Sequence, residues 1–144
     1  MLSRNRWLVE GERLEGELSK AIFAFDVWVD GTDWHKVINE RTAGRAKADY
    51  WRDVTDAWAD VPYTAMRARK LGLPRSTPNA SRVATYRNRP ELKCGVRVTA
   101  EGGTGVIVDG NGSANFDVLF DDDSPRYAGL RLNCHPAYIE QVSE

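Results

Sequence analysis

The chain has 144 residues, of which 42% are hydrophobic and 28% charged, and its formal net charge is −1. These are ordinary values for a soluble globular protein, and the length fits one domain or two small ones. No apolar run is long enough to cross a bilayer, no signal-peptide pattern opens the chain, and two cysteines are too few for a disulfide scaffold. We therefore expect a cytoplasmic protein without a membrane partner.

The first predicted element covers residues 7–29, which begin as an amphipathic helix. Its apolar residues recur at helical spacing, namely Leu14, Leu18, Ile22 and Phe25. Its last seven residues also follow a period of two, so the end of this element is open to a strand. The Asp-Gly pair that follows predicts a turn.

Three further helices are predicted before residue 72. A short one, residues 34–41, begins after a Thr-Asp pair that can cap it. A stronger one, residues 45–59, carries aromatic and apolar residues four positions apart. The last, residues 63–71, follows Pro62, whose missing N–H suits a first helical position, and it stops at Gly72.

The last two of these helices and the turn between them are spaced like a helix-turn-helix, which would place basic residues on a recognition face. An ordinary antiparallel helix pair explains the same pattern, because Trp51, Trp58 and Tyr63 would pack between the helices. We favour the helix pair, since the turn lacks the usual glycine.

An extended basic connector is predicted in residues 73–93, where Pro, Ser, Asn and Arg are frequent, and residues 82–87 of it are open to one helical turn. It belongs to a longer basic stretch, because residues 67–93 carry eight basic residues and one acidic residue. The flanking parts are acidic, with nine basic and twelve acidic residues in 1–66 and three basic and eight acidic residues in 94–144. This pattern is the clearest charge signal of the chain.

The basic stretch supplies the candidate nucleic-acid-binding residues. Its lysine and arginine side chains would neutralise phosphates and release counterions, and its tyrosine would stack on a base. The candidates are Arg67, Arg69, Lys70, Arg75, Arg82, Tyr86, Arg87, Arg89 and Lys93. Two other interpretations remain open: a solvated linker held against the acidic halves of the chain, and a segment that docks onto an acidic protein surface.

Five short strands are predicted in the C-terminal part of the chain, separated by glycine-rich and polar turns. They cover residues 96–100, 104–109, 115–121, 129–133 and 137–142. In the third strand, Phe116, Val118 and Phe120 alternate with more polar positions, which indicates a half-buried strand of an antiparallel sheet. Short apolar strands between tight turns are typical of a small β-barrel.

A family resemblance covers residues 94–142. In order along the chain come Gly95-x-x-Val98, Gly102-Gly103, Gly105-Val-Ile-Val and Phe116-Asp-Val-Leu-Phe-Asp. This order resembles the SH3-like small barrels of the KOW and Tudor-type modules, and the ending Leu132-Asn-Cys-His-Pro-x-Tyr-Ile resembles the C-termini of small uncharacterised bacteriophage proteins. The resemblance implies an SH3-like fold and the partners that KOW modules often meet, which are RNA, ribosomal protein or RNA polymerase.

The spacing of the potential metal ligands and catalytic residues does not favour a metal site or an enzyme. Cys94, Cys134 and His135 lack a fourth ligand and Cys-x-x-Cys spacing, so we expect two buried free thiols, with a disulfide as the alternative. The run Asp121-Asp122-Asp123 lacks calcium-loop spacing and is expected to be a solvated loop. His35 belongs to no catalytic motif. We expect no metal, no cofactor, no small-molecule substrate and no enzyme activity.

These observations predict an α+β chain with a helical N-terminal domain (residues 1–72), a basic connector (residues 73–93) and a C-terminal SH3-like small β-barrel (residues 94–144). The expected function is that of a non-catalytic binding protein, a phage-type accessory factor that contacts nucleic acid through its connector and protein through its barrel. The alternative is a structural virion or assembly protein that packs against neighbouring subunits. Such a protein would act in the host cytoplasm or in the virion.

Overall fold

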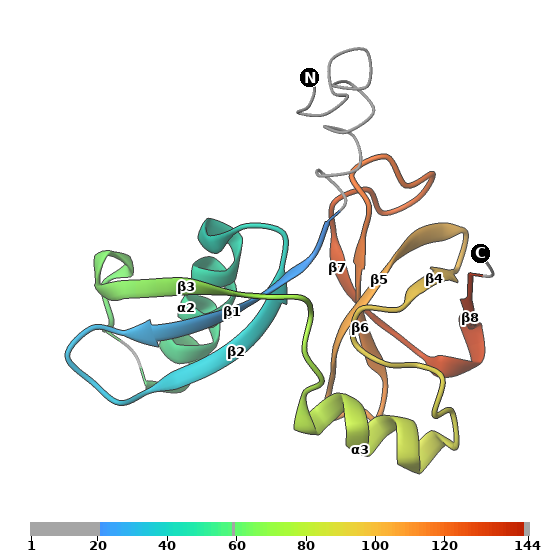
Figure 1. Cartoon of the computed structure of the whole chain (residues 1–144), viewed down its shortest axis with the longest axis horizontal. Coiled ribbons are helices and arrows are strands. Elements are labelled where there is room, and N and C mark those ends of the chain that lie inside the picture. The colour runs from blue at the N-terminus through green and yellow to red at the C-terminus, as the bar shows by residue number, and fades with distance from the viewer. Residues whose placement is uncertain (1–20, 59, 143–144) are drawn as a thin grey trace.

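A computed structural model describes residues 21–58 and 60–142 and shows a mostly β architecture (Figure 1). The described part contains a three-stranded and a five-stranded antiparallel sheet, two α-helices and two short 3-10 turns. The prediction of a helical N-terminal domain followed by an SH3-like small barrel is therefore wrong. Within the described residues, no helix is long and apolar enough to span a bilayer.

The first sheet has three antiparallel strands in the order β2-β1-β3. Its strands and the helix that packs on them are β1 (Phe23–Val29), β2 (His35–Glu40), β3 (Met66–Gly72) and α2 (Ala43–Trp58). Phe25, Val27 and Val29 of the central strand are buried in one apolar cluster with Tyr50 and Val54 of α2. α2 thus covers one face of the sheet, and among the described residues no helix covers the other face (Figure 1).

Two segments predicted as helices form strands instead. Residues 34–41 contain β2, and residues 63–71 form a 3-10 turn (Tyr63–Ala65) followed by β3. Each strand pairs with β1, so their backbone groups are satisfied across the sheet rather than within a helix. Both interpretations of residues 63–71, the helix-turn-helix and the antiparallel helix pair, are therefore wrong.

The other helix predictions in this half have mixed outcomes. The helix over residues 45–59 is confirmed by α2, in which Tyr50 and Val54, four positions apart, are both buried. The end of the first predicted element, for which a strand was the alternative to a helix, forms β1. Burial along this strand mostly alternates, as expected for a sheet with two different faces. Residues 7–20 of that element lie outside the described part of the chain.

The second sheet has five antiparallel strands in the order β7-β6-β5-β4-β8. They are β4 (Arg97–Ala100), β5 (Gly103–Gly110), β6 (Phe116–Phe120), β7 (Arg131–Cys134) and, after a 3-10 turn (Pro136–Tyr138), β8 (Ile139–Gln141). These bounds lie close to the five predicted strands, because turn residues mark the strand ends in the sequence. A core containing Ile107, Phe116, Val118 and Phe120 fills one face of this sheet.

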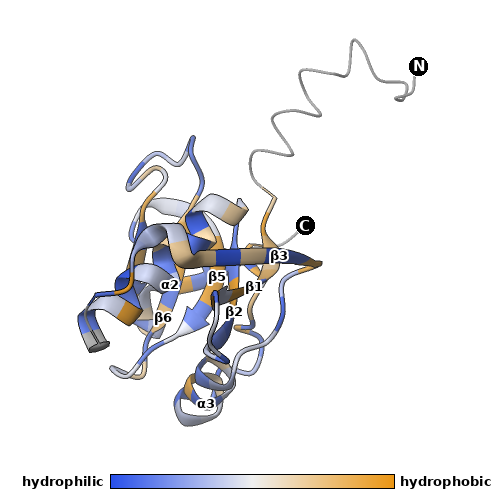
Figure 2. Ribbon diagram, turned by 90° about the vertical axis from the view of Figure 1, so that its left-hand side faces the viewer, coloured by the Kyte–Doolittle hydropathy of each residue, from blue (hydrophilic) through white to orange (hydrophobic). Residues whose placement is uncertain are grey.

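The prediction of an extended connector is wrong for residues 78–87. They form a ten-residue helix, α3 (Pro78–Arg87). Thr77 caps this helix, because its hydroxyl accepts a hydrogen bond from the Ala80 N–H (3.1 Å). The helix then packs on β5 so closely that a Cβ atom at Gly110 would lie 2.6 Å from the carbonyl oxygen of Asn79. α3 is therefore part of the five-stranded unit, and its residues are mostly hydrophilic (Figure 2).

Polar bonds join the two sheets where β2 ends. The side-chain amide of Asn39 donates to the carbonyl oxygen of Val108 in β5 (3.0 Å), and Arg41 Nη2 donates to that of Phe120 in β6 (2.5 Å). Ile22, just before β1, packs into a small apolar cluster with residues of β5 and β6. The two units are thus held together by backbone-anchored hydrogen bonds as well as by apolar contact.

Candidate nucleic-acid interface

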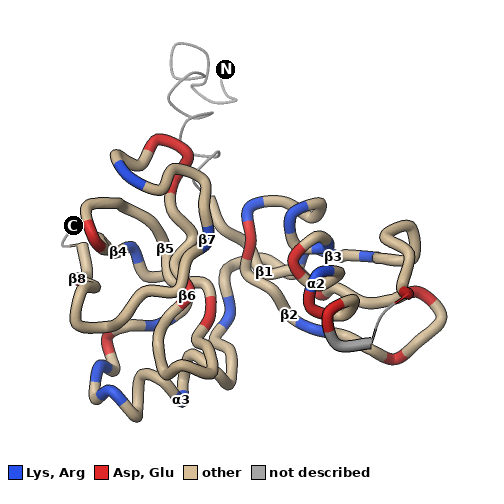
Figure 3. Tube along the Cα trace, turned by 180° about the vertical axis from the view of Figure 1, so that it is seen from behind, with Lys and Arg blue, Asp and Glu red and all other residues tan. Residues whose placement is uncertain are grey.

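The nine predicted nucleic-acid-binding residues do not form one continuous stripe. β3 carries Arg67, Arg69 and Lys70, the segment after it Arg75, α3 carries Arg82, Tyr86 and Arg87, and the segment after α3 carries Arg89 and Lys93. The structure thus divides them between the two sheets. The group around α3 is strongly basic, because residues 73–93 contain five basic residues and one acidic residue (Figure 3).

Two of these arginines hold the fold together. Arg87 Nε donates to the carbonyl oxygen of Ala114 (2.8 Å), which ties α3 to the loop between β5 and β6. Arg89 donates to the carbonyl oxygens of Pro136 (3.0 Å) and Ile139 (3.1 Å), where β8 begins. Hydrogen bonds from a charged group are costly to lose, so the protein itself fixes both guanidinium groups in place.

The outer side of α3 presents an aromatic ring beside two arginines. Tyr86 is 74% exposed, and the guanidinium carbon of Arg87 lies 5.5 Å from the centroid of its ring. Arg82 lies four positions before Tyr86 and therefore on the same side of the helix as Tyr86. Its side chain is exposed and donates a hydrogen bond to Asn79. A shallow pocket of about 200 Å³ opens here, lined by Arg82, Val83, Tyr86, Asn111, Gly112 and Ala114. An exposed ring next to cations suits a flat base and its phosphates.

Arg75 and Lys93 are the basic residues that lie beyond the two ends of α3. Asn39 fixes the backbone of Arg75, because its side-chain amide accepts from the Arg75 N–H (2.9 Å) and donates to the Arg75 carbonyl oxygen (2.8 Å). The exposed side of Arg75 borders a groove of about 540 Å³ that reaches Val37 of β2. Lys93 is exposed and lines another groove, which runs along the side of α3 away from Tyr86. The α3 surface, as we call it below, consists of Arg75, Arg82, Tyr86, Arg87 and Lys93.

The three basic residues of β3 lie on the other sheet. Arg67 and Arg69 stand opposite Trp28 and Asp26 of β1, on the face that α2 leaves uncovered, and each pairs with an aspartate. Lys70 lies over the ring of Phe23, with its ammonium nitrogen 3.6 Å from the ring centroid. The strand places Arg67 and Arg69 on the uncovered face and Lys70 on the opposite face, beside Phe25, so the three do not form one surface.

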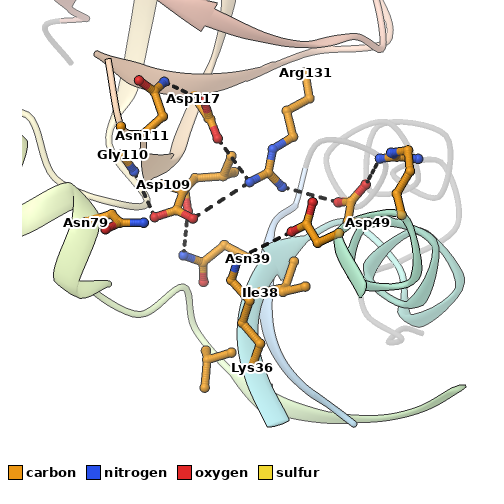
Figure 4. A pocket seen from close by; sticks show the side chains of 15 residues that line it. Lys36, Ile38, Asn39, Asp49, Asn79, Asp109, Gly110, Asn111, Asp117 and Arg131 are labelled. Carbon is orange, nitrogen blue, oxygen red and sulfur yellow. Dashed lines mark hydrogen bonds and ion pairs between the residues drawn. The ribbon is translucent and has the colours of Figure 1, made fainter. Parts of the chain in front are cut away.

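Sequence reasoning missed a polar cleft of about 290 Å³ between the two sheets (Figure 4). Arg131 of β7 lies in it and pairs with Asp49 of α2 (3.2 Å), Asp117 of β6 (3.3 Å) and Asp109 of β5 (3.9 Å). These four residues come from four different elements, so no local sequence motif predicts that they lie together. Because Arg131 faces aspartates of both units, its ion pairs join the α2 side of the three-stranded unit to the five-stranded sheet.

Glu40, at the end of β2, is 3% exposed beside this cleft. Burial and the hydrogen bond with Asp49 raise the pKa of Glu40 to about 7, although the Arg41 N–H and the charge of Arg131 act in the opposite direction. The Arg41 N–H donates to Glu40 Oε1 (2.7 Å). The Glu40 carboxyl therefore titrates near neutral pH, at a point where the two sheets meet.

The cysteines of the five-stranded unit are free thiols, and the alternative of a disulfide is wrong. Burial raises the pKa of both Cys94 and Cys134, that of Cys134 to about 11, so neither is an activated thiolate. His135 Nδ1 accepts from the Ala137 N–H (3.0 Å) and caps the 3-10 turn before β8. The described residues hold no group of three or more His, Cys, Asp or Glu side chains placed to bind a metal ion.

The run of three aspartates after β6 lies in a loop, as predicted, with Asp122 and Asp123 exposed, but Asp121 is buried. Asp121 is 2% exposed and pairs with Arg97 of β4. Asp122 pairs with the buried Arg41 (3.2 Å), which bridges the two sheets. Adjacent like charges are tolerated here because each of these two aspartates faces a different arginine.

Comparisons of the chain with family models, with curated proteins and with solved structures find no match. The resemblance of residues 94–142 to KOW and Tudor-type modules stays a prediction.

Proposed function

We propose that this protein is a non-catalytic accessory factor that binds nucleic acid on the α3 surface. The observation that carries the proposal is the position of Tyr86, whose ring is 74% exposed beside Arg82 and Arg87. Tyr86 belongs to none of the apolar clusters among the described residues, so packing does not explain it. A base stacked on this ring would bring its phosphates to the flanking arginines.

The charge distribution supports this surface over the rest of the molecule. The chain as a whole has a formal net charge of −1, whereas residues 73–93 hold five basic residues and one acidic residue. A polyanion is therefore attracted to one region of a nearly neutral protein. Four cations on the surface predict a dependence on salt with a slope of about −3, at roughly 0.7 to 0.9 per phosphate contact.

We also propose that the five-stranded sheet contacts a protein partner, as its resemblance to KOW and phage proteins implies. Leu130 and Tyr138 support this contact, because they are large apolar side chains that lie 52% and 64% exposed near β7 and β8. A structural role in a virion assembly remains the alternative, and it becomes the preferred one if the protein binds no nucleic acid.

Fluorescence anisotropy with labelled DNA and RNA oligonucleotides, each titrated across a series of salt concentrations, tests the proposal. The double variant Arg82→Ala/Lys93→Ala removes two exposed cations and should reduce the salt slope by about 1.5. Tyr86→Ala should weaken binding roughly five- to fifty-fold through the lost stacking, with little change in the slope. Arg87 and Arg89 are left intact, because their loss would also break contacts of the fold.

Arg45→Ala is the matched control, since it removes an exposed cation from the first turn of α2. The proposal is contradicted if the wild-type protein binds no oligonucleotide at low salt. It is equally contradicted if Arg45→Ala changes the affinity and the salt slope as much as the α3 variants do, since binding would then depend on overall charge alone.

A further inference from the structure

The three-stranded sheet has a second feature that a nucleic acid can use, on the face that α2 leaves uncovered. Phe25, Val27 and Val29 of β1 turn toward α2, so Asp26 and Trp28 turn to the opposite side. The open sheet face, as we call it, consists of Asp26, Trp28, His35, Val37, Arg67 and Arg69, which are paired across the three strands. In Figure 1 this face lies on the side of β1 that is turned away from α2.

An aromatic pair stands on this face. The rings of Trp28 and His35 are stacked, with their centroids 5.6 Å apart and their planes 18° from parallel. Asp26 holds the imidazole in this orientation through a hydrogen bond of 3.0 Å to Nδ1. The His35 side chain is nevertheless 49% exposed, so a third flat ring can continue the stack.

Cations flank the aromatic pair. Arg67 lies directly across β1 from His35, because both residues pair with Trp28, and Arg69 lies one pleat further along β3. Arg69 is 68% exposed and pairs with Asp26 only at 3.7 Å. Exposed ion pairs of this kind contribute little in water, so a phosphate can replace the carboxylate as the partner of the guanidinium.

The open sheet face is connected to the α3 surface. Val37, which lies beside Asp26 on the open face, also lines the groove of about 540 Å³ that Arg75 borders. The groove continues to Pro78 and Asn79, at the first turn of α3. The groove thus lies between the open sheet face and the first turn of α3.

We propose that the open sheet face binds unpaired bases, with one base stacked on the Trp28–His35 pair and its phosphates held by Arg67 and Arg69. A duplex cannot use this site, because its bases are stacked on one another and present only their edges in the grooves. The inference rests on the proposed nucleic-acid binding and names single-stranded nucleic acid as the ligand. The residues of this site belong to the three-stranded sheet, whereas the α3 surface belongs to the five-stranded unit.

The test compares a labelled oligothymidine of about twelve nucleotides with the duplex that it forms with oligodeoxyadenosine. The wild-type protein should prefer the single strand, and both His35→Ala and Trp28→Leu should weaken its binding roughly five- to fifty-fold. Neither change should alter the affinity for the duplex more than about twofold, because the duplex contacts only phosphate-binding residues. Arg45→Ala, on the opposite side of the sheet, should change neither affinity.

The outcomes separate this inference from the proposed function. If Tyr86→Ala and Arg82→Ala/Lys93→Ala weaken binding while the two sheet variants do not, the α3 surface stands and the open sheet face is not a site. If only the sheet variants weaken binding, the inference stands and the α3 surface fails. If the wild-type protein binds neither probe, both proposals fail. Should circular dichroism show that Trp28→Leu is misfolded, His35→Ala decides, because its side chain is half exposed.

Discussion

The two sheets of this protein use their faces differently. The five-stranded sheet buries one face in its own core with α3, and Val106, Val108 and Leu119 on the other side form the apolar cluster at the junction. The three-stranded sheet buries the face that α2 covers and leaves Trp28 and His35 on the other. The five-stranded sheet thus packs against other parts of the protein on both faces, whereas the three-stranded sheet has one face that no described helix covers.

The largest expected effect concerns the contribution of the core of the five-stranded unit to the stability of the fold. Phe116 is fully buried at the centre of its core, so Phe116→Ala should lower the free energy of unfolding by about 3–5 kcal/mol through lost burial and the cavity left behind. Urea unfolding followed by circular dichroism measures this change. Leu130→Ala, at an exposed position of the same unit, should stay within about 0.5 kcal/mol. A loss of less than 1 kcal/mol in Phe116→Ala, roughly what a partly exposed site gives, would show that this core does not stabilise the fold.

A medium effect concerns the junction between the two units and depends on pH. The folded-state pKa of Glu40 is raised to about 7 from 4.5, so the folded protein binds a proton there that the unfolded chain has already lost. The stabilisation from this proton is present in full below about pH 4.5 and is lost as the pH rises through about 7, with a magnitude of the order of 3 kcal/mol.

Glu40→Gln checks this expectation, because glutamine keeps the neutral shape at every pH. The difference in unfolding free energy between the variant and the wild type should grow in favour of the variant from pH 5 to pH 8, measured by urea unfolding at several pH values. Parallel pH profiles of the two proteins would mean that Glu40 is not protonated in the folded state.

The smallest effect concerns the attachment of α3 to the five-stranded sheet. The Thr77 hydroxyl accepts from the Ala80 N–H and donates to Asp109 Oδ1 (2.6 Å), so Thr77→Ala should cost about 1–2 kcal/mol. Thermal unfolding measures the loss, and Thr77→Ser, which retains the hydroxyl, should recover most of it. Equal losses in both variants would assign the effect to the methyl group instead of the cap.

Local signals in the sequence were sufficient for the five-stranded sheet and for single turns of the other half. The turn between β4 and β5 requires a positive φ at Gly102 (88°), and the turn between β1 and β2 requires one at Gly31 (81°), which glycine adopts without strain. These positions can be predicted because the conformation belongs to the residue itself. Residues 63–71 carry no such mark, and their Arg, Lys, Met and Leu residues are good helix formers.

The candidate site was predicted by residue type but not by arrangement. Tyr86 and Arg82 do lie together, because they are four positions apart on one helix. Arg87 and Arg89, of the same type and in the same segment, are engaged by carbonyl groups of distant loops, which no local pattern reveals. The Trp28–His35 pair was missed because it forms across two strands.

The order of residues alone specifies the turns, helix α2, the five C-terminal strands and the concentration of positive charge in residues 67–93. Each of these depends on neighbours within a few positions along the chain. The pairing of β1 with β3, the packing of α3 on Gly110 and the bonds of Arg41 and Arg131 depend on residues brought together from distant parts of the chain. Their free energy comes from contacts that exist only in the folded protein, so the positions of the open sheet face and of the α3 surface follow from the tertiary structure.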